Sequence, residues 1–352
     1  MKMYKTVIVL FFAALLLASC TKEETHPKSQ TSGNELENGW KVPVSKLILS
    51  QLPPDRIHSI DAPHFESLNG GNLRSSENVY VYRHGNTVKV YPQNIMGVHE
   101  IVNDRIGNHY FAVTFCPLTG SALAWDREIR GEVTEFGVSG HLFNDNLIPY
   151  DRNDSSYWSQ MNLLGIKGDH AGQELKSGQL ILTTGATVAK SFPNAMVLVD
   201  TSGHNCDSVC GGLKQGRDLG DPNEETIELP GGDLFGIING EAALLFNYDN
   251  FGDAIKVYHT NFRSSKVIVV GSESAQFIVA FRDNSGDPKI QYSPVQNELP
   301  VVLKDSHGNR FDINGLTVSG PSAGKRLPIP ISYTAHSFAW NLFFNQLELF
   351  EK

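Results

Sequence analysis

The residue types best suited to chemistry gather between His99 and Gln160, and Cys116 is the most reactive of them. Cys116 ends an apolar run and precedes Pro117, so we expect it where a strand leaves for a turn. A tight turn at Gly107-Asn108 would bring positions near His99 opposite positions near Cys116. This spacing predicts a thiolate nucleophile or a soft metal ligand with His99 as its base. The alternative is a buried, inert cysteine.

Two carboxylates flank the same predicted strand. Glu100 and Asp104 beside His99 could bind a divalent ion or transfer protons. Asn103-Asp104 also suits a turn, because short polar side chains bond to the nearby backbone, and we favour this interpretation.

A third candidate is a segment rich in amides, aromatic rings and charges. Flat rings rimmed by hydrogen-bonding groups are typical of a cleft for a sugar or another small polar ligand. The candidate ligand-binding residues are Asn144, Asn146, Tyr150, Asp151, Arg152, Trp158 and Gln160. The alternative is a loop held by its own hydrogen bonds, with Trp158 in the core.

Cys206 and Cys210 stand apart, together with His204. Outside the cytoplasm a disulfide between them is the expected state. Free thiols, or a metal site with His204 that lacks an obvious fourth ligand, are the alternatives. The sequence contains no Gly-x-Ser-x-Gly, His-Glu-x-x-His or phosphate-binding loop. Whether the protein is an enzyme stays open, and no cofactor is indicated.

The N-terminus predicts a lipoprotein. Residues 1–19 contain two early lysines and an apolar stretch too short to span a bilayer, followed by small residues before Cys20. We therefore expect a signal peptide, lipid on Cys20 and firm membrane attachment. Residues 20–45 are polar and predict a tether. Residues 21–24 resemble the export signal of some Bacteroidetes lipoproteins, which implies an outer-membrane protein facing outward; a periplasmic face is the alternative.

The charge balance argues against one class of partner. The net charge is −9, and no basic stripe is present, so we do not expect a nucleic acid partner. The expected partners are the membrane, through Cys20, and a small polar ligand or metal ion.

Short alternating apolar runs dominate the remaining chain and predict a mainly β fold with a few short helices. One framework occurs twice, over residues 46–200 and 233–352, with a linker at 201–232. In this alignment Gly85 matches Gly240, and Cys116 matches Gly271. We therefore expect two related β-rich lobes from an internal duplication, with a degenerate second copy and the site in the first. Residues 334–349 predict a longer closing helix.

Several motifs resemble the bacterial family called domain of unknown function 3179. They read HEIVND from His99, FCPLTGSALAWDR from Phe115, FGVSG from Phe136, NLIPYDRNDSSYWSQ from Asn146 and DRIHSIDAPHF from Asp55. The resemblance implies no activity. Many relatives have a second cysteine in Cys-Pro-Leu-Cys-Gly where this chain has Thr119, which argues against a Cys-x-x-Cys redox or metal role here. A small-ligand or metal-binding envelope protein, a Cys116–His99 enzyme and a purely structural protein remain as hypotheses.

Overall fold

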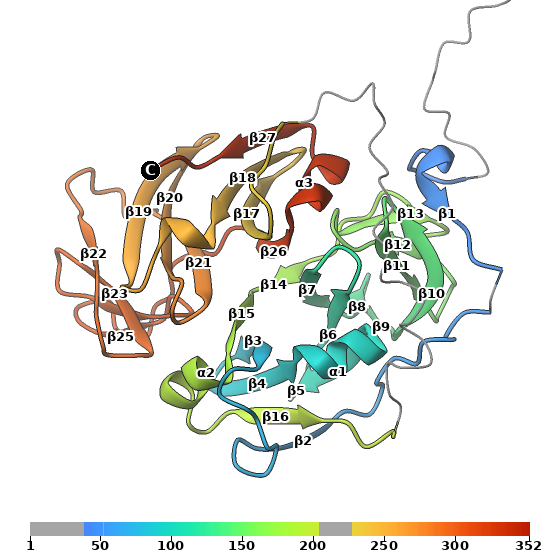
Figure 1. Cartoon of the computed structure of the whole chain (residues 1–352), viewed down its shortest axis with the longest axis horizontal. Coiled ribbons are helices and arrows are strands. Elements are labelled where there is room, and N and C mark those ends of the chain that lie inside the picture. Colours follow the sequence, from blue (N-terminus) through green and yellow to red (C-terminus); the bar gives the residue numbers. More distant parts are fainter. Residues whose placement is uncertain (1–38, 52, 204–226) are drawn as a thin grey trace, which may run out of the picture. The chain divides into compact units, whose positions relative to one another are not determined.

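The predicted mainly β class is confirmed. The computed structural model describes residues 39–51, 53–203 and 227–352, and all of them belong to one compact unit. Strands make up 47% of the structure and helices 9%. Figure 1 shows the strands grouped into several sheets, with the helices at strand connections. No helix in these ranges is long and apolar enough to cross a membrane.

The first half contains three main sheets. One has the order β15-β3-β4-β16-β2, from Leu180–Thr184, Asn78–His84, Thr87–Pro92, Met196–Val199 and His64–Ser67. A second has the order β14-β7-β6-β5, from Ser177–Gly178, Ser121–Asp126, His109–Cys116 and Ile101–Ile106. The third has the order β1-β10-β11-β12-β13, from Leu47–Ile48, Phe136–Phe143, Asn146–Asp151, Tyr157–Ser159 and Leu164–Lys167. A small hairpin joins β8 (Glu128–Ile129) to β9 (Glu132–Val133).

The second half uses a closely similar set of sheets. The order β26-β17-β18-β27 comprises Ser332–His336, Asp233–Asn239, Ala242–Asn247 and Gln346–Leu349. The order β19-β20-β21 comprises Lys256–Phe262, Ser265–Ser272 and Phe277–Arg282. The order β22-β23-β24-β25 comprises Tyr292–Pro294, Val301–Asp305, Arg310–Asp312 and Thr317–Ser319. In each half a central hairpin pairs antiparallel with one neighbour and parallel with the other: β15 and β16 around β3–β4, β26 and β27 around β17–β18.

The hairpin turns fix how positions in the two halves correspond. The β5–β6 turn closes at the pair Ile106–His109, and the β19–β20 turn closes at Phe262–Ser265. The next turns close at Cys116–Ser121 and at Ser272–Phe277. Cys116 therefore occupies the strand-end position of Ser272, one residue beyond the Gly271 that the sequence alignment gave, because sequence similarity fixes a register less sharply than the turns do.

The core is shared between the two halves. Successive residues of β3 point to opposite faces, so Val79 and Val81 enter a different apolar cluster from Tyr80 and Tyr82. The cluster of Val79 and Val81 also contains Ile268 and other second-half residues, and the cluster around Trp158 contains Trp340. Residues of both halves therefore pack into the same apolar clusters.

The described residues contain three short helices, and the last of them is shorter than expected. α1 spans Gln93–His99 and α2 spans Gly185–Ser191. α3 spans only Ser337–Phe343 of the predicted 334–349. The flanking residues form β26 and β27, because pairing with β17 and β18 satisfies their backbone groups instead. The 3₁₀ turns are η1 (Val44–Lys46) and η4 (Tyr248–Asn250).

Candidate functional site

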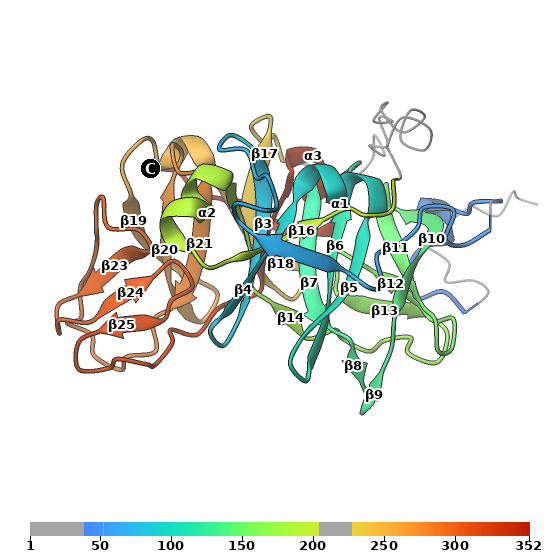
Figure 2. The ribbon, with the colours of Figure 1, turned by 90° about the horizontal axis from the view of Figure 1, so that it is seen from below.

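A cleft of about 500 Å³ opens beside the β5–β6–β7 sheet, and we call it the first cleft. In Figure 2 these strands run side by side, with the β8–β9 hairpin beyond their ends. The residues that line the cleft come from β4, β5, β6 and the segments before β2, β8 and β10. They are Asp61, Ala62, Pro63, Lys89, Asn103, Asp104, Arg105, Tyr110, Arg127 and Glu135.

One pair of charges in the first cleft is fully neutralised. The Lys89 amino group lies 2.7 and 2.8 Å from the two carboxylate oxygens of Asp104, whose side chain is 3% exposed. Tyr91 donates its hydroxyl to the same carboxylate at 2.6 Å, and the Arg105 amide donates at 2.7 Å. Both Asp104 oxygens are therefore committed to the protein. Asn103 and Asp104 lie inside β5, which places them away from the turn we favoured for them.

Arg152 forms ion pairs with the carboxylates of the acidic wall of the cleft. Its guanidinium forms ion pairs with Asp61 at 2.6 Å and with Glu135 at 3.3 Å. It also pairs with Asp55 at 3.1 Å, and Tyr150 donates its hydroxyl to Asp55 at 2.5 Å. Arg152 and Tyr150, two predicted ligand-binding residues, thus lie at the border of the first cleft and hold its acidic groups in place.

Two cationic side chains in the cleft remain without an acidic partner. Arg127 is only 6% exposed, yet its Nε donates to the Thr134 carbonyl at 2.7 Å and Nη1 lies 3.5 Å from the Asp104 carbonyl. Neither Arg127 nor the exposed Arg105 forms an ion pair with any residue in the described ranges. Burial lowers the pKa of Arg127, although nearby carboxylates act in the opposite direction.

The residues that line the first cleft carry three cationic side chains and three carboxylates, but only some of these charges form ion pairs. Lys89 forms an ion pair with Asp104, and Arg152 forms ion pairs with Asp61 and Glu135. Arg105 and Arg127 are the remaining charges among the residues that line it. Guanidinium groups bind carboxylate and phosphate oxygens through two parallel hydrogen bonds. The Tyr110 ring, whose centroid lies 5.9 Å from the Arg127 guanidinium, adds a flat apolar surface.

Cys116 lies elsewhere, in the buried end of β6. Its thiol is free, the side chain is 2% exposed, and Sγ donates weakly to the Asp145 carbonyl at 3.7 Å. Burial and then the neighbouring Glu100 carboxyl raise the pKa of Cys116, while hydrogen bonds from Thr119 and Leu147 act to lower it. The protonated thiol is therefore favoured at neutral pH, and a thiol is a weaker nucleophile than a thiolate.

Glu100 is the unusual neighbour of Cys116. It caps α1 with a φ of 58°, a left-handed conformation that costs strain in a residue with a Cβ. The residue is 7% exposed, and burial raises the pKa of its carboxyl from 4.5 to about 8. No side-chain hydrogen bond to Glu100 is formed by any other residue that the structure describes. Glu100 is therefore largely neutral at pH 7.

The His99 ring is engaged away from the thiol. Nδ1 lies 2.7 Å from the His58 carbonyl and so carries a hydrogen, and Nε2 lies 3.3 Å from an Asp200 carboxylate oxygen. Burial acts to raise the pKa of Asp200, but hydrogen bonds from Ser202 and His99 hold it below its usual value. The structure thus brings Glu100, rather than the His99 ring, into electrostatic contact with Cys116.

Asn146 and Gln160 form a buried hydrogen-bond network close to Cys116. Asn146 Nδ2 donates to Gln160 Oε1 at 2.7 Å and to the Thr119 hydroxyl at 2.9 Å. The Ser121 hydroxyl donates to Gln160 Oε1 at 2.7 Å. Each side chain is at most 1% exposed, so these groups satisfy one another and link the turn between β6 and β7 to β11. Thr119 is therefore part of this network.

The remaining predicted ligand-binding residues have structural contacts. Asn144 donates to the Leu342 carbonyl of α3 at 2.5 Å, and Trp158 is fully buried in the largest apolar cluster. Asp151 accepts from the Thr134 hydroxyl at 2.5 Å and from the Asn153 amide at 2.8 Å.

Asp151 also belongs to the one group of potential metal ligands found in the described ranges. One carboxylate oxygen of Asp151, one of Asp154 and one ring nitrogen of His170 lie within 4.8 Å of one another. His170 is already bonded to Asp154 at 2.9 Å and to Gln173 at 3.0 Å. Both ring nitrogens of His170 therefore have protein partners. The predicted metal ligands Glu100 and Asp104 are not members of this group.

Four predicted residues lie outside the described ranges: Cys20, His204, Cys206 and Cys210. Conversely, the cations of the first cleft that form no ion pair were not among the predicted site residues. Arg105 and Tyr110 are cross-strand partners two positions from the predicted Gly107-Asn108 turn. That register was available from the turn, and it would have placed both side chains on one face.

A family model described as a protein of unknown function (DUF3179) matches residues 54–347. The chain belongs to this family. The DUF3179 match includes the first cleft, Cys116 and nearly all of the second half, so it extends well beyond the strongest motifs near residues 99–160. Searches of curated proteins and of solved structures gave no match.

Proposed function

We propose that this protein is a lipid-anchored envelope protein whose first cleft binds a small anionic ligand, one that carries a carboxylate, phosphate or sulfate group. The observation that carries the proposal is the pair Arg105 and Arg127, two guanidinium groups that form no ion pair with the described residues, in a cleft whose other charged side chains all do. A buried cation is costly without a counterion. An anionic ligand would supply that counterion.

The second line of support is the rigidity of the binding groups. Arg127 is fixed by its bond to the Thr134 carbonyl, and the Lys89–Asp104 pair forms a fixed wall beside it. A site whose donors are held in place before binding loses less entropy when the ligand arrives. This favours a binding module over the alternative enzyme built on Cys116 and His99, because the local environment keeps Cys116 protonated and His99 engaged.

The proposed location in the cell envelope is inferred from the sequence. The short apolar stretch before Cys20 supports a signal peptide with lipid on that cysteine, and residues 20–45 would serve as a tether. The acidic segment after Cys20 supports attachment to the outer membrane with the folded part outward. The proposed partners are therefore a membrane, through the lipid, and a small anion.

We also infer that the two halves arose by internal duplication. Similar turns in the two halves support this. The Gly165 carbonyl accepts a hydrogen bond from the Gly172 amide, and the Thr317 carbonyl accepts one from the Gly324 amide. The contacts between halves are reciprocal as well. The His336 amide donates to the Thr119 carbonyl, and Thr187 donates to the carbonyl of Ala275, which occupies the position of Thr119 in the second half.

Isothermal titration calorimetry of the purified protein with succinate and with inorganic phosphate tests the proposed ligand class. Arg127→Gln removes one charge, and the loss of a charged hydrogen-bonding pair predicts binding weakened at least about tenfold. Arg130→Gln is the matched control, because Arg130 is an exposed arginine of the β8–β9 turn and does not line the cleft. Equal affinities for the wild type and Arg127→Gln, or no heat of binding with either anion, would reject the proposal.

A further inference from the structure

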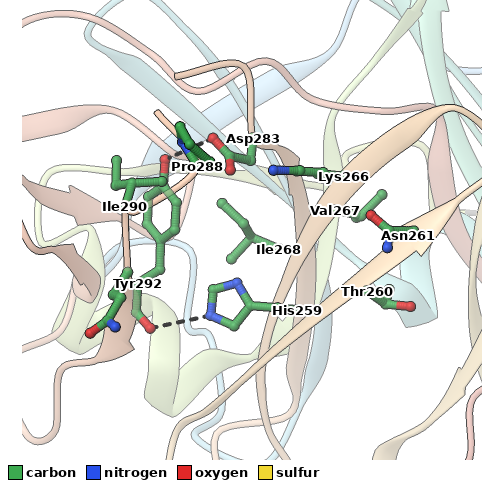
Figure 3. Close-up of a pocket in the computed structure, with 11 residues that line it drawn as sticks. His259, Thr260, Asn261, Lys266, Val267, Ile268, Asp283, Pro288, Ile290 and Tyr292 are labelled. Carbon is green, nitrogen blue, oxygen red and sulfur yellow. Dashed lines mark hydrogen bonds between the residues drawn. The ribbon is translucent and has the colours of Figure 1, made fainter. Parts of the chain in front are cut away.

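The second half contains a cleft of its own, of about 540 Å³, between β19, β20 and the segment that leads to β22. We call it the second cleft. Figure 3 shows His259, Lys266 and Asp283 around it, with Ile268 between them and Ile290 to one side, beside Tyr292. The second half therefore retains a concave surface, although the sequence suggested that it was the plain copy.

The second cleft lies at the position that corresponds to the first. The β5–β6 and β19–β20 turns relate residues 156 positions apart, as in His109 and Ser265. By this relation Tyr110 corresponds to Lys266, and Arg127 corresponds to Asp283. The backbone confirms the match, because the Arg127 amide donates to the Tyr110 carbonyl at 2.9 Å and the Asp283 amide donates to the Lys266 carbonyl at 3.0 Å.

The chemistry at the corresponding positions is different. Where the first cleft has the Arg127 cation, the second has the Asp283 carboxylate, and Lys266 supplies a cation where the first has Tyr110. Figure 3 shows the Lys266 amino group and the Asp283 carboxylate on the same side of the cleft. No ion pair joins them, and neither forms one with another residue in the described ranges.

One oxygen of the Asp283 carboxylate has hydrogen-bond partners in the protein, and the other is available to a ligand. Oδ1 accepts from the Ser285 amide at 3.1 Å and lies 3.5 Å from the Tyr292 hydroxyl. No hydrogen bond to Oδ2 comes from the residues that the structure describes. His259 is oriented by its Nε2, which lies 3.2 Å from the Tyr292 carbonyl and so donates to it. One face of the cleft thus offers a carboxylate and an ammonium group above aliphatic side chains.

We propose that the second cleft is a separate ligand site that takes a small zwitterion of the amino acid class. The ligand's ammonium group would bind Asp283, its carboxylate would bind Lys266, and an aliphatic side chain would contact the partly exposed Ile290. A zwitterion matches both charges at once, whereas an anion or a cation alone would leave one of them unsatisfied. This site does not depend on the anion proposed for the first cleft.

Saturation-transfer difference NMR on the purified full-length protein, with glycine, L-leucine and L-glutamate as probes, tests the proposal. We expect saturation transfer to L-leucine and a weaker effect with isovalerate or isoamylamine, which each carry only one of the two charges. Lys266→Gln and Asp283→Asn should each weaken binding of L-leucine at least about tenfold, as expected for losing a charged partner. Arg127→Gln, in the first cleft, should leave it unchanged.

Each result of this experiment either supports or overturns the proposed amino acid site. Lys266 is exposed, so Lys266→Gln is expected to fold even if Asp283→Asn does not, and it decides the question alone in that case. Absence of binding for all three amino acids, or binding that Lys266→Gln leaves intact, overturns the proposal. Loss of amino acid binding in Arg127→Gln also overturns it, because it would place the ligand in the first cleft. Anion binding is measured separately, so the two proposals can fail independently.

Discussion

Replacement of Glu100 by glutamine should change how the stability of this protein depends on pH. Burial of Glu100 disfavours its charged form and raises its pKa from 4.5 to about 8. An acid whose pKa is higher in the folded state binds its proton more tightly there. Its contribution to stability is therefore complete below pH 4.5 and is lost as the pH rises through 8. Glutamine has a similar shape and stays neutral across this range.

The size of the effect follows from the two pKa values. At about 1.4 kcal/mol per pKa unit, ionisation of Glu100 costs the folded protein ~3 kcal/mol at pH 7 and ~1 kcal/mol at pH 5. The difference in unfolding free energy between Glu100→Gln and the wild type should therefore shift by roughly 2 kcal/mol in favour of the variant between pH 5 and pH 7. A buried amide without partners costs about 1–3 kcal/mol, but that cost is the same at both pH values.

Urea unfolding followed by tryptophan fluorescence at pH 5 and pH 7 measures this shift. Glu132→Gln is the matched control, because Glu132 is exposed on β9 and its replacement should leave the pH dependence as in the wild type. If Glu100→Gln and the wild type lose stability in parallel between pH 5 and pH 7, the assignment of a buried, neutral Glu100 is refuted.

Three further predictions concern buried side chains. Cys116, which is 2% exposed with a raised pKa, should react with iodoacetamide on the order of a hundredfold more slowly in the native protein than in urea. Equal rates, measured by mass spectrometry of its peptide, would show an accessible thiolate. Asp104→Asn should cost about 3–5 kcal/mol in urea unfolding, since it leaves the Lys89 charge without its partner; a loss below about 1 kcal/mol would contradict this. Trp158→Ala should cost about 3–5 kcal/mol because the ring is fully buried. An unchanged melting temperature would instead point to a ring that faces a ligand.

The strands and turns could be predicted because they depend on local patterns. Asn78–His84 and His109–Cys116 are short runs rich in valine and aromatic residues, and Gly107 provides the positive φ that the turn between strands requires. The end of α3 could not be predicted in this way. Its flanking residues pair with strands that lie about 100 positions away, and that pairing overrides an apolar helical period.

The candidate site was predicted in part. Tyr150 and Arg152 were identified by residue type and do lie beside the first cleft, at its acidic wall. Arg127 carried no signal in the sequence, because an arginine that follows a strand is common and only the fold shows that it is buried without an acidic partner. Residue types thus indicate where polar chemistry is present, whereas charge balance depends on contacts between distant segments.

The most direct test of the first cleft is a crystal structure of the protein grown with succinate. We predict that a carboxylate of the ligand lies within hydrogen-bond distance of the Arg127 guanidinium and that the Lys89–Asp104 and Arg152–Asp61 ion pairs are unchanged. Electron density for the ligand elsewhere, or an Arg127 side chain turned to form an ion pair with Asp61 or Glu135, would contradict it.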